Sequence, residues 1–199
     1  MGLNRGDRAA SSPAELPCRT PSNNALADGA AVWLATGLYL SYIPSTLLDA
    51  IPRAKFFEWT RGRRWTGAGL MGTVEGLILA PLLPAAPLRF CAFWACAVAV
   101  ACWLCDRAEK AFGVHDDPRI VLDEVVGFWT AIAFLPPRLP VWMAAFVLFR
   151  VLDSWKLPPW SWLERLPGGL GVVADDVGAG VAANIGLRIL LWFVPWFGL

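Results

Sequence analysis

Residues 65–105 decide the fold class, and they read WTGAGLMGTVEGLILAPLLPAAPLRFCAFWACAVAVACWLC. Trp65 to Leu88 is apolar except for Glu75, and Phe90 to Cys105 carries no charged residue. A helix needs about 20 apolar residues, within a range of about 17–25, to cross the hydrocarbon core of a bilayer. The two segments are joined by a tight connection at Pro84 to Pro87. The pattern therefore predicts a transmembrane helical hairpin.

The composition of the whole chain agrees with a protein that is partly dissolved in lipid. Of the 199 residues, 57% are apolar and 17% are charged, whereas an average soluble domain has about 45–50% apolar and about 25% charged residues. The 12 tryptophans point the same way, because Trp favours membrane–water interfaces. The formal net charge of +1 gives no overall basic field, so we expect no nucleic-acid partner.

Further apolar helices are expected on both sides of the hairpin. The segments are Ala30 to Ile51, Ile120 to Leu135, Leu139 to Trp155 and Val172 to Phe197. Proline and glycine clusters separate them, and such clusters break helices. The predicted fold is all-α: a polytopic membrane bundle of about five or six helices. Residues 26–199 are expected to form one membrane-embedded domain, and residues 1–25 a flexible cytoplasmic tail.

The distribution of basic residues predicts the orientation of this bundle. The tail carries three arginines and no apolar core, and residues 53–64 form a second basic stretch. Basic residues in short connections mark the cytoplasmic side of a membrane. With both stretches in the cytoplasm, the segment 30–51 must be re-entrant or interfacial. The segments 106–119 and 153–171, read as loops, are then cytoplasmic as well.

Acidic residues recur at the ends of the apolar segments, where a charge is costly to place. They are Asp123 with Glu124, Asp153, and Asp175 with Asp176. Carboxylates on neighbouring helix ends repel each other unless a cation lies among them. Mg²⁺ is the expected cation, because it takes hard oxygen ligands and often bridges carboxylates to phosphate. A simpler explanation also stays open, since acid pairs at helix starts complement the helix dipole.

Two basic residues lie beside one of these acids. Arg150 precedes Asp153 by three residues, so the two side chains share one face of a helix. Lys156 follows three residues later. Arginine can grip a phosphate with two nitrogens, and lysine adds a point charge. Carboxylates, a guanidinium and an ammonium together predict a metal-assisted site for phosphoryl chemistry.

Several other kinds of site are excluded by the same sequence. His115 is the single histidine, which excludes a histidine-rich metal site and the lipid phosphatases that use two catalytic histidines. No D-x-D-x-[TV] nucleophile motif is present, and the run from Asp28 to Ala31 only begins like the motif of the CDP-alcohol phosphotransferases. The five cysteines lack a zinc-site pattern and are expected to be small packing residues.

Three segments together resemble one known family. They are HDDPRIVLDEVVG at 115–127, FRVLDSWK at 149–156 and GGLGVVADDVGAG at 168–180. In order, spacing and polar residues they are similar to the phosphatidylglycerophosphatase A family. The resemblance implies a multi-pass enzyme of the bacterial inner membrane whose active site faces the cytoplasm. It implies a phospholipid substrate, with Mg²⁺-dependent removal of the terminal phosphate of phosphatidylglycerophosphate.

The resemblance also implies roles for individual residues. The implied Mg²⁺ ligands come from Asp116, Asp123, Glu124, Asp153, Asp175 and Asp176. The implied catalytic residues are Asp123, Arg150, Asp153, Lys156 and Asp176, in which Arg150 and Lys156 bind the phosphate and stabilise charge in the transition state. A water molecule activated by the metal is the expected nucleophile, and a covalent intermediate through an aspartate or Thr73 is the alternative.

The N-terminal half departs from the family pattern, which runs through a glycine-rich stretch into P-G-T-x-G-S-L. Thr36-Gly37-Leu38 resembles the start of this stretch, and Gly72-Thr73-Val74-Glu75-Gly76-Leu77 its end. Met71 replaces the proline, Glu75 a glycine and Gly76 the serine, and the basic stretch between the two parts looks inserted. Two other functions stay open: a phosphatase for another lipid phosphomonoester such as phosphatidate, and a non-enzymatic, cation-binding membrane protein. No feature identifies a protein partner.

Overall fold

The computed structural model describes residues 25–43, 67–113, 117–155, 162–163 and 166–193. Within these ranges the regular elements are all helices and none is a strand, which confirms the all-α prediction. The α-helices are α1 (Ala25–Ala35), α3 (Ala68–Leu79), α4 (Pro87–Phe112), α5 (Leu122–Ala131), α6 (Leu139–Trp155) and α7 (Gly169–Phe193). Two short 3₁₀ helices, η1 (Leu40–Tyr42) and η3 (Ala80–Leu82), follow α1 and α3.

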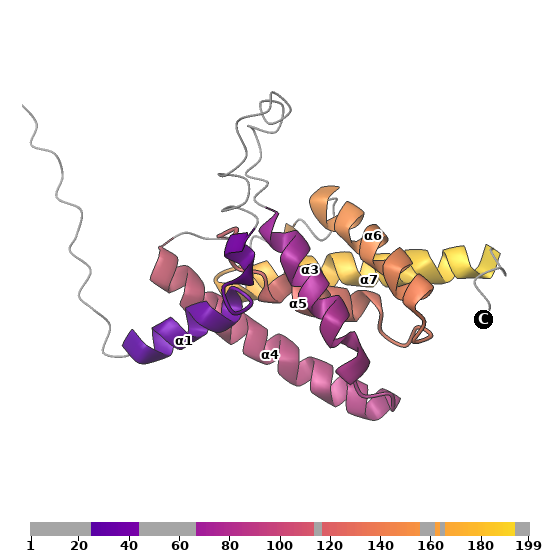
Figure 1. The fold of residues 1–199 in the computed structure, drawn as a ribbon, viewed down its shortest axis with the longest axis horizontal. Coiled ribbons are helices and arrows are strands. Elements are labelled where there is room, and N and C mark those ends of the chain that lie inside the picture. Colours follow the sequence, from indigo (N-terminus) through magenta and orange to yellow (C-terminus); the bar gives the residue numbers. More distant parts are fainter. Residues whose placement is uncertain (1–24, 44–66, 114–116, 156–161, 164–165, 194–199) are drawn as a thin grey trace, which may run out of the picture.

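Helix α5 lies at the centre of the bundle, where it contacts α3, α4, α6 and α7 (Figure 1). Most of its ten residues are buried, although two of them are acidic. Its tightest neighbour is α7, because the two backbones meet at Gly127 and Gly180. A side chain at Gly180 would collide with the Gly127 carbonyl oxygen. Small residues allow this close approach between apolar helices.

Helix α3 approaches α5 through glycines on one of its faces. A side chain at Gly72 would collide with the carbonyl oxygen of Val121, at the start of α5. A Cβ at Gly76 would lie 3.2 Å from the ring of Phe128. The Gly76 carbonyl accepts a hydrogen bond of 3.0 Å from the indole Nε1 of Trp129. The glycines thus bring α3 directly over the N-terminal half of α5.

Within the part of the chain that the structure describes, two helices, α4 with 26 residues and α7 with 25, are long and apolar enough to cross a membrane. Helix α3 has only 12 residues before η3 and is too short for a full span. Helix α1 has 11 residues and ends before a turn at Gly37. It packs along α4, where Asp28 pairs with Arg107 at 3.0 Å.

Several predicted boundaries hold and others do not. Helix α6 spans the predicted residues 139–155. The prediction of a loop over 106–119 is wrong for its first half, because α4 continues to Phe112. An ion pair between Asp106 and Lys110 joins successive turns there, and Gly113, with a φ of 76°, ends the helix. The apolar run therefore ends about two turns before the helix does.

The positions of the acid pairs also differ from the prediction. Asp123 and Glu124 do lie in the first turn of α5. Asp175 and Asp176, however, lie well inside α7, because this helix begins at Gly169 rather than Val172. The dipole of a helix start therefore does not explain the second pair. Residues 1–24 of the predicted tail and the basic stretch 53–64 lie outside the described residues.

Candidate active site

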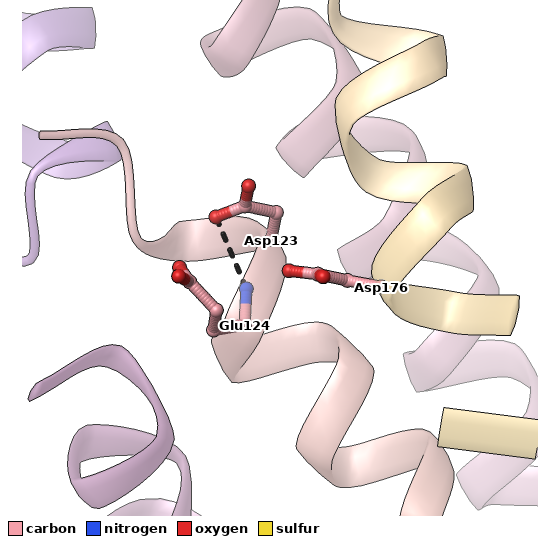
Figure 2. Close-up of side chains that lie close together, drawn as sticks. All are labelled: Asp123, Glu124 and Asp176. Atoms are coloured by element: carbon pink, nitrogen blue, oxygen red, sulfur yellow. Dashed lines mark hydrogen bonds between the residues drawn. The ribbon is translucent and has the colours of Figure 1, made fainter. Parts of the chain in front are cut away.

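Three carboxylates from two helices converge on one point (Figure 2). Asp123 and Glu124 come from the first turn of α5, and Asp176 comes from α7. One oxygen of each lies within 4.8 Å of the others. Asp123 and Asp176 are each about 6% exposed, so this group of three carboxylates, the carboxylate group below, is largely withdrawn from water.

Local structure explains how the carboxylate group is assembled. The Glu124 backbone N–H donates a hydrogen bond of 3.1 Å to Oδ1 of Asp123, which orients that carboxylate. One turn later Gly127 lets α7 approach. A Cβ at Gly127 would lie 2.9 Å from the carbonyl oxygen of Asp176 and 3.0 Å from its Cβ. Any larger residue at position 127 would push Asp176 away from α5.

Helix α3 closes the next side of the site. A side chain at Gly69 would collide with Oε1 of Glu124, and its Cβ would lie 3.1 Å from Nη2 of Arg150. The buried Thr73, one turn further, donates a hydrogen bond of 3.0 Å to the Gly69 carbonyl oxygen. Its Oγ1 also accepts a long hydrogen bond of 3.4 Å from Nη1 of Arg150. Gly69 provides the space that Glu124 and Arg150 share.

Helix α6 contributes the cation and a fourth acid. Nη1 of Arg150 lies 3.0 Å from Oδ2 of Asp153, and both side chains are about 15% exposed. The predicted shared face of these two residues is therefore confirmed. Asp153 also acts electrostatically on Glu124 and Asp176. The guanidinium is thus held at the edge of the carboxylate group by Asp153 and Thr73, which both contact its Nη1.

The buried acids of the site outnumber its positive charges. Burial raises the pKa of Glu124 to about 7, although the hydrogen bond from Asp123 and the charge of Arg150 oppose this shift. Oε2 of Glu124 is buried and accepts no hydrogen bond. Four acids around one arginine leave an excess of negative charge, which is expensive away from water. A donor set of carboxylate oxygens fits a hard divalent cation such as Mg²⁺.

The predicted site residues fall into three classes. Asp123, Glu124 and Asp176 converge, and Arg150 with Asp153 lies beside them. Asp175 is buried on α7 but does not belong to the carboxylate group. Asp116 and Lys156 lie outside the described residues.

Two residues in or beside the site were not assigned to it from the sequence. Gly69 makes room for Glu124 and Arg150, and Glu75 places another acid on α3. Burial and then the charge of Glu124 raise the pKa of Glu75 to about 7. The signal for the glycine was its spacing: Gly69, Gly72 and Gly76 recur at intervals of three and four, which puts them on one helix face.

Known proteins resemble the chain over most of its length. A family model described as Phosphatidylglycerophosphatase A matches residues 54–191. A Phosphatidylglycerophosphatase A of Escherichia coli K12 is 43% identical over 86 residues, which are 42% of this chain and 50% of the relative. The chain thus spans about half of that relative's length. No solved structure matches the chain.

Two further relatives are covered more fully. A Phosphatidylglycerophosphatase A of Haemophilus influenzae is 38% identical over 122 residues, covering 60% of this chain and 74% of the relative. A Putative phosphatidylinositol-3-phosphatase of Bacteroides thetaiotaomicron is 32% identical over 139 residues, covering 65% of this chain and 84% of the relative. The family match covers the helices α3 to α6 in full and α7 as far as residue 191, and so includes the helices that build the site. The chain belongs to the phosphatidylglycerophosphatase A family.

Proposed function

We propose that this protein hydrolyses phosphatidylglycerophosphate to phosphatidylglycerol and inorganic phosphate, with Mg²⁺ as its cofactor. The carrying observation is the convergence of Asp123, Glu124 and Asp176 beside Arg150. Membership of the family and the names of two relatives support the choice of substrate. The protein is then a phosphoric monoester hydrolase of phospholipid synthesis.

In this proposal the carboxylate group holds the metal. Its oxygens are hard ligands at mutual distances that one cation can bridge, and the unpartnered Oε2 of Glu124 supports this assignment. When bound, Mg²⁺ would neutralise charge on the phosphoryl oxygens and help to orient the phosphate. Asp153, Asp175 and Asp116 remain candidate ligands from the resemblance, and Asp153 pairs with Arg150 at 3.0 Å.

Arg150 binds the phosphate in the proposed mechanism. Asp153 and Thr73 hold its Nη1 edge, so the guanidinium is oriented before the substrate arrives. A preorganised donor of this kind stabilises the charge that develops on the phosphoryl oxygens without reorganising during the reaction. Lys156 is proposed to add a second positive charge from the segment that follows α6.

Water is the proposed nucleophile. Thr73 is the alternative from the sequence, but its side chain is fully buried and its hydroxyl already donates to the Gly69 carbonyl oxygen. Both features favour a supporting role for Thr73 beside Arg150. Carboxylates around the bound phosphate are suited to accept the proton that an attacking water molecule loses.

We further propose that residues 26–199 form one domain in the inner membrane of a bacterium, with residues 1–25 as a cytoplasmic tail. Helices α4 and α7 are the proposed spans. The basic residues of the 53–64 stretch support a cytoplasm-facing site. The bilayer would then hold the acyl chains of the phospholipid while its headgroup reaches the carboxylates at the interface.

Phosphate release from a panel of lipids tests this function against its rivals. The purified protein in detergent should release phosphate from phosphatidylglycerophosphate, stop in excess EDTA and recover with Mg²⁺. Faster release from phosphatidate, or from the phosphatidylinositol 3-phosphate suggested by the name of the third relative, would make it a phosphatase for another lipid. No release from any lipid at saturating Mg²⁺ would favour a non-enzymatic, cation-binding protein.

A further inference from the structure

Glu75 on α3 is an acid near the site that the proposed mechanism does not use. Its side chain is half-buried, and one carboxylate oxygen, Oε1, is buried without a hydrogen-bond partner. It is not one of the three converging carboxylates. A buried acceptor that lacks a donor destabilises a fold, and native structures rarely keep one without a reason.

The carboxylate of Glu75 rests against the turn that follows α1. A side chain at Gly37 would collide with both of its oxygens and lie 2.6 Å from its Cδ. Gly37 therefore has to be a glycine for reasons of space as well as conformation, since its φ is 56°. The backbone of the turn therefore packs directly against the Glu75 carboxylate on α3.

This turn is strained and firmly attached to the start of α5. Leu38 and Tyr39 follow Gly37, and their φ values of 53° and 66° lie in the left-handed region. Residues other than glycine rarely adopt this backbone conformation. The Val121 N–H donates a hydrogen bond of 2.8 Å to the Ala35 carbonyl oxygen, just before the turn. Strain of this kind persists where surrounding structure enforces it, and it clusters at ligand sites.

Glu75 thus lies next to the site without being part of the carboxylate group. The charge of Glu124 acts on it directly, and Gly72, one turn before Glu75 on α3, lies against Glu124: a Cβ at Gly72 would be 3.2 Å from the Cβ of Glu124. The ligand group suited to this place is a hydrogen-bond donor that belongs to the substrate and lies close to its phosphate. Oε1 is enclosed, but the side chain as a whole is only half-buried, so such a donor can reach the carboxylate from outside at its other oxygen, Oε2.

The headgroup of phosphatidylglycerophosphate carries such a donor. The carbon next to its phosphate-ester carbon bears a free hydroxyl, whereas the corresponding carbon of phosphatidate bears an acyl ester. We propose that Glu75 is a specificity-determining residue whose carboxylate accepts a hydrogen bond from this neighbouring hydroxyl. The inference rests on the proposed function, and it extends to any polyol phosphate headgroup with a hydroxyl at that position.

The hydrogen bond between Glu75 and the substrate hydroxyl is tested by changing each partner separately and then both together. The substrates are phosphatidylglycerophosphate and its analogue without the free hydroxyl, built on 1,3-propanediol. Wild type and Glu75→Ala are compared, with Glu75→Gln as the conservative variant. A hydrogen bond to a charged group is worth about 10- to 150-fold in an equilibrium or rate ratio. Wild type should prefer the natural substrate in kcat/KM by a factor in this range.

In Glu75→Ala the preference should fall to about one, because the natural substrate loses that factor and the analogue has no contact to lose. Glu75→Gln, which still accepts a hydrogen bond, should keep part of the preference. Asp28→Ala removes a carboxylate on α1 that pairs with Arg107. This control variant should keep the full preference for the natural substrate. Thermal melting of each variant controls for folding.

Two results overturn the inference while leaving the proposed function intact. One is a Glu75→Ala variant that still prefers the natural substrate as strongly as wild type does. The other is an equal loss of kcat/KM for both substrates, which would place Glu75 in folding or in the chemical step. A wild-type protein that hydrolyses neither lipid contradicts the proposed function itself, and this inference with it.

Discussion

Gly127 on α5 lies directly beneath the backbone of Asp176 on α7, so a Cβ at position 127 would lie 2.9 Å from the Asp176 carbonyl oxygen. Phe149 of α6 closes the same space, because its ring would lie 2.8 Å from that Cβ. The position of the third carboxylate therefore depends on the absence of a side chain on the neighbouring helix. An apparently structural glycine sets the geometry of the candidate metal site.

Replacing Gly127 with alanine should therefore reduce both stability and activity. The added methyl group has no space unless α7 moves, and overpacking of this kind costs about 1–3 kcal/mol. The movement carries Asp176 away from α5, so turnover should fall more than the melting temperature alone explains. Gly29→Ala is the matched control, since that glycine on α1 has open space and alanine favours a helix by about 1 kcal/mol. Equal activity in the two variants would show that the close approach is not needed.

Thr73 should act through Arg150. Thr73→Val keeps the shape of the side chain but removes the hydroxyl that meets Nη1 of Arg150 and the Gly69 carbonyl. The bond from the charged guanidinium is the one that bears on the reaction. A hydrogen bond to a charged group contributes about 1.5–3 kcal/mol, and this one is long at 3.4 Å, so kcat should fall by about tenfold. Thr73→Ser, which keeps the hydroxyl, should restore most of the rate.

The control for this assignment is a variant of Arg150 itself. In the background Arg150→Lys, which lacks the planar fork, the further change Thr73→Val should have little additional effect on kcat. Full additivity of the two losses would mean that Thr73 does not work through Arg150. Complete loss of activity in Thr73→Val, with Thr73→Ser still active, would instead point to a nucleophilic hydroxyl.

Mg²⁺ should raise the melting temperature of the wild-type protein. A ligand that binds only the folded state stabilises it by about 2.7 kcal/mol at 100 times its dissociation constant. Asp176→Asn removes one of the three converging carboxylates, so the Mg²⁺-dependent shift should largely disappear. Without metal this variant should melt at or above the wild-type temperature, because like charges no longer crowd. A lower metal-free melting temperature would indicate that Asp176 serves the fold instead.

The basic stretch 53–64 should face the cytoplasm. In a background without the native cysteines, a single cysteine at Thr60 should resist an impermeant thiol reagent in intact cells and react after lysis. The basic residues around it motivate this orientation. Ready labelling from outside would invert the topology and put the candidate site on the opposite side of the membrane.

The chemistry-bearing residues of this site could be predicted from the sequence, but their arrangement could not. Arg150 and Asp153 were expected on one face because helical spacing fixes it, and they pair at 3.0 Å. Asp175 and Asp176 looked equivalent, yet successive residues on a helix point about 100° apart. Only the packing of α7 on Gly127 decides that Asp176 meets α5. That contact is between helices, and no local pattern encodes it.

Other features were missed because hydropathy is a poor guide to where a helix ends. Helix α4 continues past the apolar run because Asp106 and Lys110 support its last turns.

The strained turn at Gly37 to Tyr39 has no sequence signature beyond its single glycine, since leucine and tyrosine rarely adopt positive φ values. The role of Glu75 follows from that turn, so it too emerged only from the three-dimensional structure.

The central claim is that the converging carboxylates hold the metal that makes phosphate hydrolysis possible. The most direct test is turnover of phosphatidylglycerophosphate at saturating Mg²⁺ by three variants: Asp123→Asn and Asp176→Asn in the carboxylate group, and Asp153→Asn at the candidate ligand beside Arg150. Asp106→Asn on α4 is the control. Each of the three variants should fold and yet lose turnover by orders of magnitude, because a bound metal stabilises transition-state charge by several kcal/mol. Asp106→Asn should stay active. Near-normal turnover in all three variants would contradict the account.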